Sequence, residues 1–475
     1  MALRGLAMNA DISISPKIEP PLDRGYVPPI LWVKAFQQRV DGSGNPQRAA
    51  LTLEREGGAI SRYETRLLPS GGAGDALNNR YMERLVKFLL WARGGYKLRI
   101  AAPEGTIRHL QQAYSPTGER AFDHAFFEKK IYARPFVVEA CAYRDLPESK
   151  EFARPMGGHT NGCRVGIDLG GSDRKCAAVK DGAVLHTEEV EWDPYGNPDP
   201  RWHYEGIDDS IRRAAEKLPR VDAIGVSAAG IYIDNQARVA SLFRGVPESA
   251  FESGIRPIFS RLQQKWGGVP LVVANDGDVT ALAGAMASRE HSFLGIAMGT
   301  SAAGGYVDEN GRITGRLNEL AFVPVDFRMN APVDEWSGDI GCGAQYFSQQ
   351  AVARLIGPAG IKLNPALPDA KKLLEVQKLS EGGDERAKKI YETIGVELGY
   401  SIAWFNEFYR MAHVLLLGRV MTGAGGTIVK ESAQKVLRAE FPDLLENIRV
   451  HEPSEGEKRH GQAVAAATLP PLDQR

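Results

Sequence analysis

The chain has 475 residues, of which 43% are hydrophobic and 25% are charged, which is typical of a globular protein with two or three domains. Its 58 basic and 59 acidic residues give a net charge of −1, which argues against a general attraction to nucleic acids or acidic membranes. No segment has the apolar length of a signal peptide or a membrane span, so we expect a protein that is neither secreted nor inserted in a membrane.

The first third of the chain predicts an arm, a domain and a linker. Residues 1–47 contain several prolines and little periodicity, which indicates an extended N-terminal arm packed on another part of the protein. Residues 48–145 predict an accessory α/β domain that opens with a β-hairpin over residues 48–68 and closes with a strand over residues 136–143. A polar linker over residues 146–160 follows.

From residue 161 onward, predicted strands alternate with helices. This order is typical of a largely parallel sheet covered by helices, in which ligands collect at the carboxyl ends of the strands. Chemically distinctive residues lie at these strand ends: Asp168, Gly230, Asp276 and Gly299.

The first such end is in RVGIDLGGSDRKCAAVKD, where Asp168 precedes Gly170, Gly171 and Ser172. Two glycines let backbone amides approach a ligand closely, and a turn of amides can cradle phosphate oxygens. A carboxylate at this turn can hold a magnesium ion through water. A plain hairpin whose aspartate caps its own turn explains the stretch equally well.

The second is in VVANDGDVTALAG, where a buried strand delivers Asn275 and Asp276 to the start of a helix. Asn275 can donate and accept hydrogen bonds with sugar hydroxyls, and Asp276 can take the proton of a hydroxyl that attacks a phosphate. Considered alone, this stretch is better explained by a helix cap.

Two glycine-rich turns follow. In GIAMGTSAAGGYVD, the hydroxyls and amides of Gly299, Thr300 and Ser301 can stabilise a transferring phosphoryl group, although any glycine-rich hairpin has the same appearance. Near the C-terminus, a buried strand runs into GAGG and then a helix, which offers Gly425 and Gly426 to the base and ribose of a nucleotide. The spacing is neither that of a P-loop nor that of a dinucleotide fingerprint.

In this order, the motifs resemble the superfamily of actin, sugar kinases and heat-shock ATPases, and within it the ROK family of sugar kinases and regulators. The resemblance covers residues 164–437 and rests on five segments: DLGGSDRK, VANDGDVTALAG, MGTSAAGGYVD, GRLNELAFVPVD and IGCGAQYFSQQAVARL. It implies two actin-like (ribonuclease H-like) α/β lobes with a central cleft, over residues 161–290 and 291–475, preceded by the accessory domain.

The resemblance also implies an ATP- and Mg²⁺-dependent sugar kinase with Asp276 as general base and Asp168 organising the metal through water. The sugar would contact Asn275, Glu319 and Gly230. Phosphates and nucleotide would lie against Gly170, Gly171, Ser172, Lys175, Gly299, Thr300, Ser301, Gly425 and Gly426. The family habit is a cytoplasmic homodimer with a small-molecule sugar substrate.

The chain departs from the family at its zinc and sugar positions. Phe322 stands where the family has a histidine, and Ala344 stands where it has a glutamate. Only Cys342 remains of the zinc-binding cysteines, and the four cysteines are far apart, so we expect no zinc site, no disulfides and a reducing cytoplasm. The retained Asp168, Asp276 and Gly299-Thr300 favour a sugar kinase. The changes at Phe322 and Ala344 favour a non-catalytic sugar-sensing regulator, and an ATPase without a small substrate also stays open.

The accessory domain predicts no helix-turn-helix with a basic recognition face, so DNA binding is not expected. Its order of elements loosely repeats that of the Asp168 half of the chain. We therefore hypothesise that the domain is a decayed copy of that half.

Overall fold

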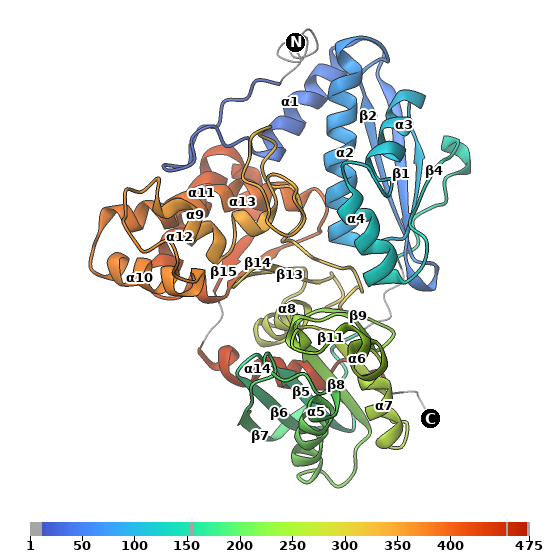
Figure 1. Ribbon diagram of the computed structural model, residues 1–475, viewed down its shortest axis with the longest axis vertical. Coiled ribbons are helices and arrows are strands. Elements are labelled where there is room, and N and C mark those ends of the chain that lie inside the picture. Colours follow the sequence, from blue (N-terminus) through green and yellow to red (C-terminus); the bar gives the residue numbers. More distant parts are fainter. Residues whose placement is uncertain (1–11, 152–155, 453–454, 473–475) are drawn as a thin grey trace.

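The structure, a computed structural model, describes residues 12–151, 156–452 and 455–472 (Figure 1). Three α/β bodies share the chain: the accessory domain in blue and cyan, a first lobe in green, and a second lobe in yellow to orange. None of the helices in these residues is long and apolar enough to cross a membrane.

The accessory domain is one mixed sheet covered by helices, with strand order β2-β1-β3-β4. The predicted hairpin is confirmed, since β1 and β2 pair antiparallel from Gln47 and Leu67 to Glu54 and Ile60. The elements are β1 (Gln47–Glu54), β2 (Ile60–Leu67), α2 (Ala73–Arg93), β3 (Lys97–Ala101), α3 (Glu104–Ala113), α4 (Ala121–Ala125), the π-helical turn η3 (Phe126–Tyr132) and β4 (Val137–Ala140).

The topology contradicts the hypothesis of a decayed copy. In the accessory sheet the first strand, β1, is antiparallel to both of its neighbours, β2 and β3. In the first lobe the first strand, β5, is antiparallel to β6 but parallel to β8. Because the direction of a strand is set by its connections, the two sheets are wired differently and the repeat hypothesis is wrong.

The first lobe has a five-stranded sheet of order β11-β8-β5-β6-β7, in which β5, β8 and β11 are parallel. The carboxyl ends of these three strands therefore meet at one edge, as predicted. The elements are β5 (Cys163–Leu169), β6 (Asp173–Lys180), β7 (Ala183–Glu191), α5 (Pro200–Ala215), β8 (Ala223–Ala228), β9 (Ile231–Ile233), β10 (Gln236–Val239), α6 (Glu248–Ala250), α7 (Ile258–Lys265), β11 (Leu271–Asn275) and α8 (Asp276–Ser288).

The second lobe has a four-stranded sheet of order β13-β12-β14-β15, with several helices on it. Its elements are β12 (Phe293–Met298), β13 (Ala302–Val307), α9 (Gln349–Ile356), α10 (Asp369–Glu381), α11 (Glu385–Asn406), β14 (His413–Leu417), α12 (Ala424–Glu440), α13 (Pro442–Asn447) and β15 (Arg449–His451).

The last helix, α14 (Glu455–Ala467), returns to the first lobe, so the prediction that residues 291–475 all lie in the second lobe is wrong for this helix (Figure 1). It packs on β5, β6 and β8. The approach is close: a Cβ on Gly166 would lie 1.9 Å from the Ala463 oxygen, and one on Gly225 would lie 1.7 Å from the Ala466 oxygen. Glycines in two adjacent strands, β5 and β8, therefore allow the backbone of this alanine-rich helix to pack directly on the sheet.

The predicted N-terminal arm is extended only in part. Residues 29–41 form helix α1 (Pro29–Asp41), so the prediction of an extended arm over residues 1–47 is wrong there, and residues 1–11 lie outside the described part. Proline at the start of α1 is compatible with the first helical turn, and Ile30, Trp32 and Phe36 give the helix a buried face.

One hydrophobic core joins the accessory domain to the second lobe, whereas the first lobe has a separate core. Phe88 of α2 contacts the rings of Trp404 and Phe408, with ring centroids 5.3 and 4.1 Å apart. The accessory domain and the second lobe therefore form one packed unit, and a third apolar cluster packs α8 and α14 against β12, β13 and β14.

Candidate active site

Asp168 lies at the carboxyl end of the fully buried strand β5. The Ser227 hydroxyl, from the adjacent strand β8, donates to Asp168 Oδ1 over 2.8 Å. Burial raises the pKa of Asp168 to about 6, and the negative charge of Asp276 adds to this effect. The ionised carboxylate is thus poorly compensated by the protein alone, which fits a bound cation.

The turn after β5 is glycine-rich for steric reasons. A Cβ on Gly171 would lie 2.2 Å from the Tyr195 hydroxyl oxygen, so a larger residue would displace this exposed ring from the turn. The Arg244 guanidinium stacks on the Tyr195 ring, 3.9 Å from its centroid. Sequence reasoning missed Tyr195 and Arg244, because both come from loops far along the chain and match no motif.

The polar partners of the turn lie on β6. Gly170 N–H donates to the Asp173 backbone oxygen over 2.9 Å, which closes the turn, and the Ser172 hydroxyl donates to the Asp173 carboxylate. Lys175 stands opposite Asp168 in the strand register, and its Nζ lies 2.7 Å from Asp173 Oδ1. The predicted phosphate residues of this segment therefore surround Asp168.

Asn275 caps α8, as its sequence context alone suggested. Its Oδ1 accepts from Gly277 N–H over 2.8 Å, while its Nδ2 donates to the Gly230 oxygen over 2.7 Å. Gly230 has φ 138°, and a Cβ there would lie 2.3 Å from the Val239 oxygen, so the position requires glycine. The cap thus ties two of the predicted sugar-contacting positions together.

Asp276 is the first residue of α8 and is partly exposed. Burial raises the pKa of Asp276, while hydrogen bonding to Gly277 N–H opposes this rise. Its place at the helix N-terminus favours the ionised form.

Three carboxyl groups gather around the start of α8. Burial raises the pKa of Glu319 to about 8, and the negative charges of Asp276 and Asp278 contribute. Burial likewise raises the pKa of Asp278 to about 7. The structure therefore brings the predicted base and the predicted sugar-contacting glutamate together, and it adds Asp278, which the sequence reasoning had noted only as a residue of the first helical turn.

Asp278 anchors the segment that carries Glu319. Its Oδ1 accepts from Tyr306 N–H and from Asn318 Nδ2, both over 2.9 Å. Asn318 has φ 53°, a left-handed conformation that asparagine tolerates. The Tyr409 hydroxyl donates to Asn318 Oδ1 over 3.0 Å.

The accessory domain holds the same segment from the other side. Asn318 N–H donates to the Ala92 oxygen over 3.1 Å, and Glu319 N–H donates to the Trp91 oxygen over 3.0 Å. Helix α2 ends at Arg93, so these are carbonyl groups of its last turn, which have no partner within the helix. The end of α2 thereby fixes the backbone of Glu319.

Phe322, at the family's histidine position, belongs to an aromatic cluster that crosses from the accessory domain to the second lobe. Its ring centroid lies 4.2 Å from that of Trp91 and 5.8 Å from that of Trp336. The members of the aromatic cluster are Trp91, Phe122, Phe126, Phe322 and Trp336. Phe322 therefore makes an aromatic contact between the accessory domain and the second lobe.

A buried charge cluster lies beside Cys342, which the sequence resemblance places at one of the family's zinc positions. Cys342 Sγ is 3.8 Å from Asp339 Oδ2, and Asp339 in turn contacts Arg84, Lys87 and Arg120 of the accessory domain. Glu83 and Asp123 complete the charge cluster. Three cations surround the position, which disfavours a divalent ion there. In the described ranges, no group of three or more His, Cys, Asp or Glu side chains could hold a metal.

The second phosphate-type turn joins β12 to β13. Gly299 N–H donates to the Ser301 oxygen over 3.0 Å, and the Gly299 oxygen accepts from Gln349 N–H, at the start of α9, over 2.9 Å. Thr300 and Ser301 are exposed, so their hydroxyls are free to meet a ligand in solution.

Gly425 and Gly426 have a packing role in this structure. A Cβ on Gly425 would lie 2.5 Å from the Tyr391 ring, and one on Gly426 would lie 2.0 Å from the Met421 oxygen. Both glycines are buried in the first turn of α12. Gly423, the cap that precedes them, is exposed. Contact of Gly425 and Gly426 with adenosine stays a prediction.

The chain is similar to solved structures of ROK proteins. The ROK hexokinase from Thermus thermophilus is 20% identical with a TM-score of 0.51, over 65% of this chain and 97% of that chain. A ROK family glucokinase from Streptomyces griseus, solved with glucose and AMPPNP, is 22% identical with a TM-score of 0.46, over 64% and 98%. A ROK family transcriptional regulator, a homolog of the E. coli MLC protein, is 16% identical with a TM-score of 0.49, over 82% and 96%.

At 20% identity the likeness to the hexokinase shows the fold and confirms the predicted two lobes, while the separate sheet β2-β1-β3-β4 confirms the predicted smaller α/β domain in front of them. No curated protein sequence matches the chain significantly. The model of the ROK family matches residues 164–468, which is more than half of the chain and leaves out the accessory domain. The chain therefore belongs to the ROK family.

Proposed function

We propose that this chain is an ATP-dependent kinase of a hexose-like sugar, with Asp276 as general base. The observation that carries the proposal is the position of Asp276 after β11: burial, and with it the negative charge of Asp276, raises the pKa of both Asp168, at the end of β5, and Glu319, in the segment after β13. A base, a metal-organising carboxylate and a sugar-contacting carboxyl are the groups that phosphoryl transfer to an alcohol needs.

In the proposed reaction Asp276 takes the proton of a sugar hydroxyl while that oxygen attacks the γ-phosphorus of ATP, and the bond to the β–γ bridging oxygen breaks to release ADP. The raised pKa of Asp276 makes the carboxylate a stronger base than an exposed aspartate. The N-terminus of α8 keeps it ionised enough to act.

Asp168 would hold Mg²⁺ through water, and the ion would neutralise charge on the phosphates. The fit rests on the carboxylate itself: only its Oδ1 receives the Ser227 hydrogen bond, and burial leaves the anion undercompensated. The turns at Gly170 and Gly299 supply amides and hydroxyls for the phosphate oxygens.

Glu319 would bind sugar hydroxyls. Because burial raises the pKa of Glu319 to about 8, its carboxyl group carries a proton at neutral pH and can both donate and accept a hydrogen bond. A hydroxyl pair needs both capacities.

The second candidate function is a non-catalytic sugar-sensing regulator of the same family. The observation in its favour is Phe322, which packs so closely in the aromatic cluster that only 6% of the residue is exposed. Ala344, 2% exposed, likewise offers no polar group where the family has a glutamate. Loss of both polar groups weakens the sugar contacts expected of a kinase.

The test is coupled ADP release from purified protein with MgATP and a panel of hexoses, amino sugars and N-acetylated sugars. A kinase shows turnover that one sugar raises well above background and that Asp276→Asn abolishes. Asp443→Asn, a change of an exposed carboxylate on α13, is the matched control and should leave the rate unchanged. Sugar binding by calorimetry without turnover favours the sensor, and ATP turnover that no sugar stimulates favours an ATPase.

The homodimer and the cytoplasmic location implied by the family stay predictions. Sedimentation velocity measures the first and cell fractionation the second.

A further inference from the structure

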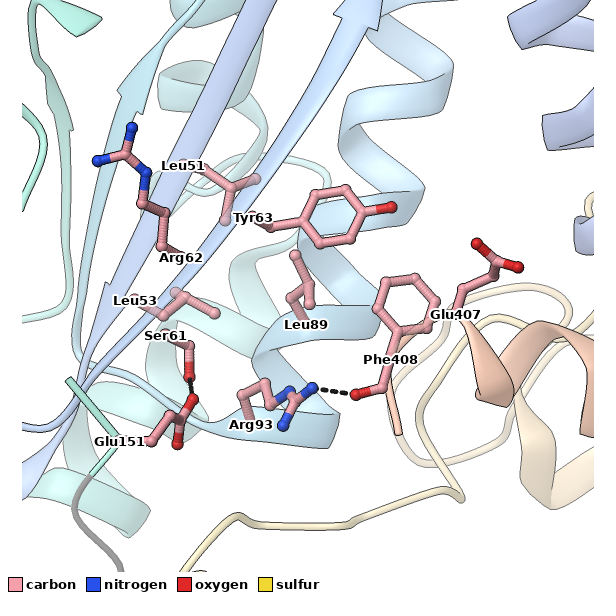
Figure 2. Close-up of a pocket in the computed structure, with 10 residues that line it drawn as sticks. All are labelled: Leu51, Leu53, Ser61, Arg62, Tyr63, Leu89, Arg93, Glu151, Glu407 and Phe408. Atoms are coloured by element: carbon pink, nitrogen blue, oxygen red, sulfur yellow. Dashed lines mark hydrogen bonds between the residues drawn. The ribbon is translucent and has the colours of Figure 1, made fainter. Parts of the chain in front are cut away.

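A pocket lies between the accessory domain and the second lobe, and none of the site residues described above lines it (Figure 2). Its volume is about 200 Å³, the space of roughly seven liquid waters at about 30 Å³ each, so it admits a small metabolite. Apolar side chains from β1, β2, α2 and the segment after α11 form the walls: Leu51, Leu53, Tyr63, Leu89 and Phe408. Ser61, Arg93 and Glu151 form the polar floor.

Arg93 points to a ligand. Its Nη2 donates to the Phe408 backbone oxygen, whereas its Nη1 is buried with no hydrogen-bond partner. Figure 2 shows the guanidinium group on the floor of the pocket, between Glu151 and Phe408. Burial lowers the pKa of Arg93, while the charges of Tyr409 and Glu151 oppose this effect. A guanidinium nevertheless stays charged, so one that lines a pocket without an ion pair is best satisfied by an oxyanion.

The nearest carboxylate does not fill this role. Glu151 Oε1 accepts from the Ser61 hydroxyl over 2.5 Å, and Glu151 Oε2 forms an ion pair with Arg55 Nη2 over 2.5 Å. Glu407, the other carboxylate of the pocket, is exposed at its edge. Neither carboxylate that lines the pocket forms an ion pair with Arg93, so the guanidinium charge is left for an anion from solution.

We propose that this pocket binds a small organic anion, a carboxylate or a phosphate monoester, whose oxygens meet Arg93 and whose carbon skeleton lies between Leu89 and Phe408.

The pocket connects to the candidate active site through neighbouring residues in the chain. Arg93 follows Trp91 and Ala92, whose oxygens accept from the backbone N–H groups of Glu319 and Asn318. Phe408 precedes Tyr409, whose hydroxyl donates to Asn318 Oδ1. An anion that changes the Arg93 contact with Phe408 thus shifts two of the groups that hold Asn318, the Ala92 oxygen and the Tyr409 hydroxyl, and the ligand acts as an effector of the Glu319 segment. The binding of the anion and its effect on the Glu319 segment do not depend on the proposed function. Only a resulting change in sugar affinity would rest on it.

Calorimetric titration of the full chain with inorganic phosphate, glucose 6-phosphate and lactate tests the site. At least one probe should bind in the millimolar range or tighter, and Arg93→Gln should weaken it about tenfold or more, the loss expected for a charge-assisted hydrogen bond. Leu89→Phe, which fills the pocket and keeps Arg93, should weaken it similarly. Arg108→Gln, an exposed change on α3, is the matched control and should leave binding unchanged.

Lactate and glucose 6-phosphate separate the two kinds of anion, and binding of either supports the site. Two results overturn it: none of the probes binds, or a probe binds equally to Arg93→Gln and Leu89→Phe, which places it elsewhere, for example at the phosphate turns. The titration needs no turnover, so a failed kinase assay does not affect it.

Hydrogen exchange at the amides of Asn318 and Glu319 tests the effector role. A bound probe should change their exchange rates at least about twofold in the parent chain but not in Arg93→Gln. Equal rates with and without a bound probe overturn the effector role.

Discussion

Replacing Asp168 by asparagine should stabilise the protein while it removes the proposed metal site. Burial raises the pKa of Asp168 from 3.8 to about 6, so the folded state favours the protonated group. Ionising it in the folded protein therefore costs on the order of 3 kcal/mol, at about 1.4 kcal/mol per pKa unit. Asparagine keeps the size and the hydrogen bond from Ser227 without the charge.

The sign of the pH dependence follows from the raised pKa. The protonated group contributes stability that is fully present below the ordinary pKa of 3.8 and is lost as the pH rises to about 6. The free energy of unfolding of Asp168→Asn should therefore exceed that of the parent by up to about 3 kcal/mol near neutral pH, and the gap should close toward pH 4.

Urea unfolding at several pH values, without Mg²⁺, measures this difference. Asp443→Asn serves as the control and should show no such gap. Added MgATP should stabilise the parent more than Asp168→Asn. A variant that is no more stable than the parent near neutral pH, or a gap that does not change between pH 4 and 6, would refute the account of this carboxylate.

Three further predictions concern the support of the site. Asp339→Asn should lower the free energy of unfolding by about 3–5 kcal/mol in urea, because it leaves a buried cation unpaired; a loss below about 1 kcal/mol, the usual value of a surface pair, contradicts this. Gly166→Ala should destabilise by about 1–3 kcal/mol and expose α14 to limited proteolysis, because its Cβ would meet the α14 backbone. Gly105→Ala, where no atom lies within 4 Å of the new Cβ, should be neutral or stabilising. Trp91→Ala should lower kcat/KM for the sugar about 10- to 100-fold with KM for MgATP unchanged, since it loosens the Glu319 segment; an equal rise in both KM values would contradict a selective effect on the sugar site.

Several of the predicted site residues could be proposed from the sequence because they lie in short motifs at strand ends; their roles stay predictions. Asp168, Asn275 and Asp276 are placed by local geometry: a buried strand, then a glycine turn or a helix start. Glu319 could be found only through the resemblance to a family, since its own segment has no regular secondary structure.

The contacts between domains could not be predicted from the sequence. The pairing of Asp339 with Arg84, Lys87 and Arg120 joins residues more than 200 positions apart, and each charge alone resembles an ordinary surface charge. The same holds for the two hydrogen bonds from the Glu319 segment to α2, which involve only backbone atoms and leave no trace in residue type.

Small residues caused the error over α14. Its buried alanines, Ala463, Ala466 and Ala467, fit any flat sheet. The residue pattern therefore did not indicate on which of the two lobes this helix packs. Gly166 and Gly225 complete the fit, but a glycine in a strand has several explanations. In α1, prolines at the start obscured an apolar spacing that the structure shows to be helical.

The most direct test of the central claim is phosphorus NMR of the chain incubated with MgATP and the sugar that best stimulates ADP release. The account predicts a sugar phosphate resonance that grows in step with ADP and is absent with Asp276→Asn. ADP that appears with inorganic phosphate alone, or a sugar phosphate formed equally by Asp276→Asn, would contradict it.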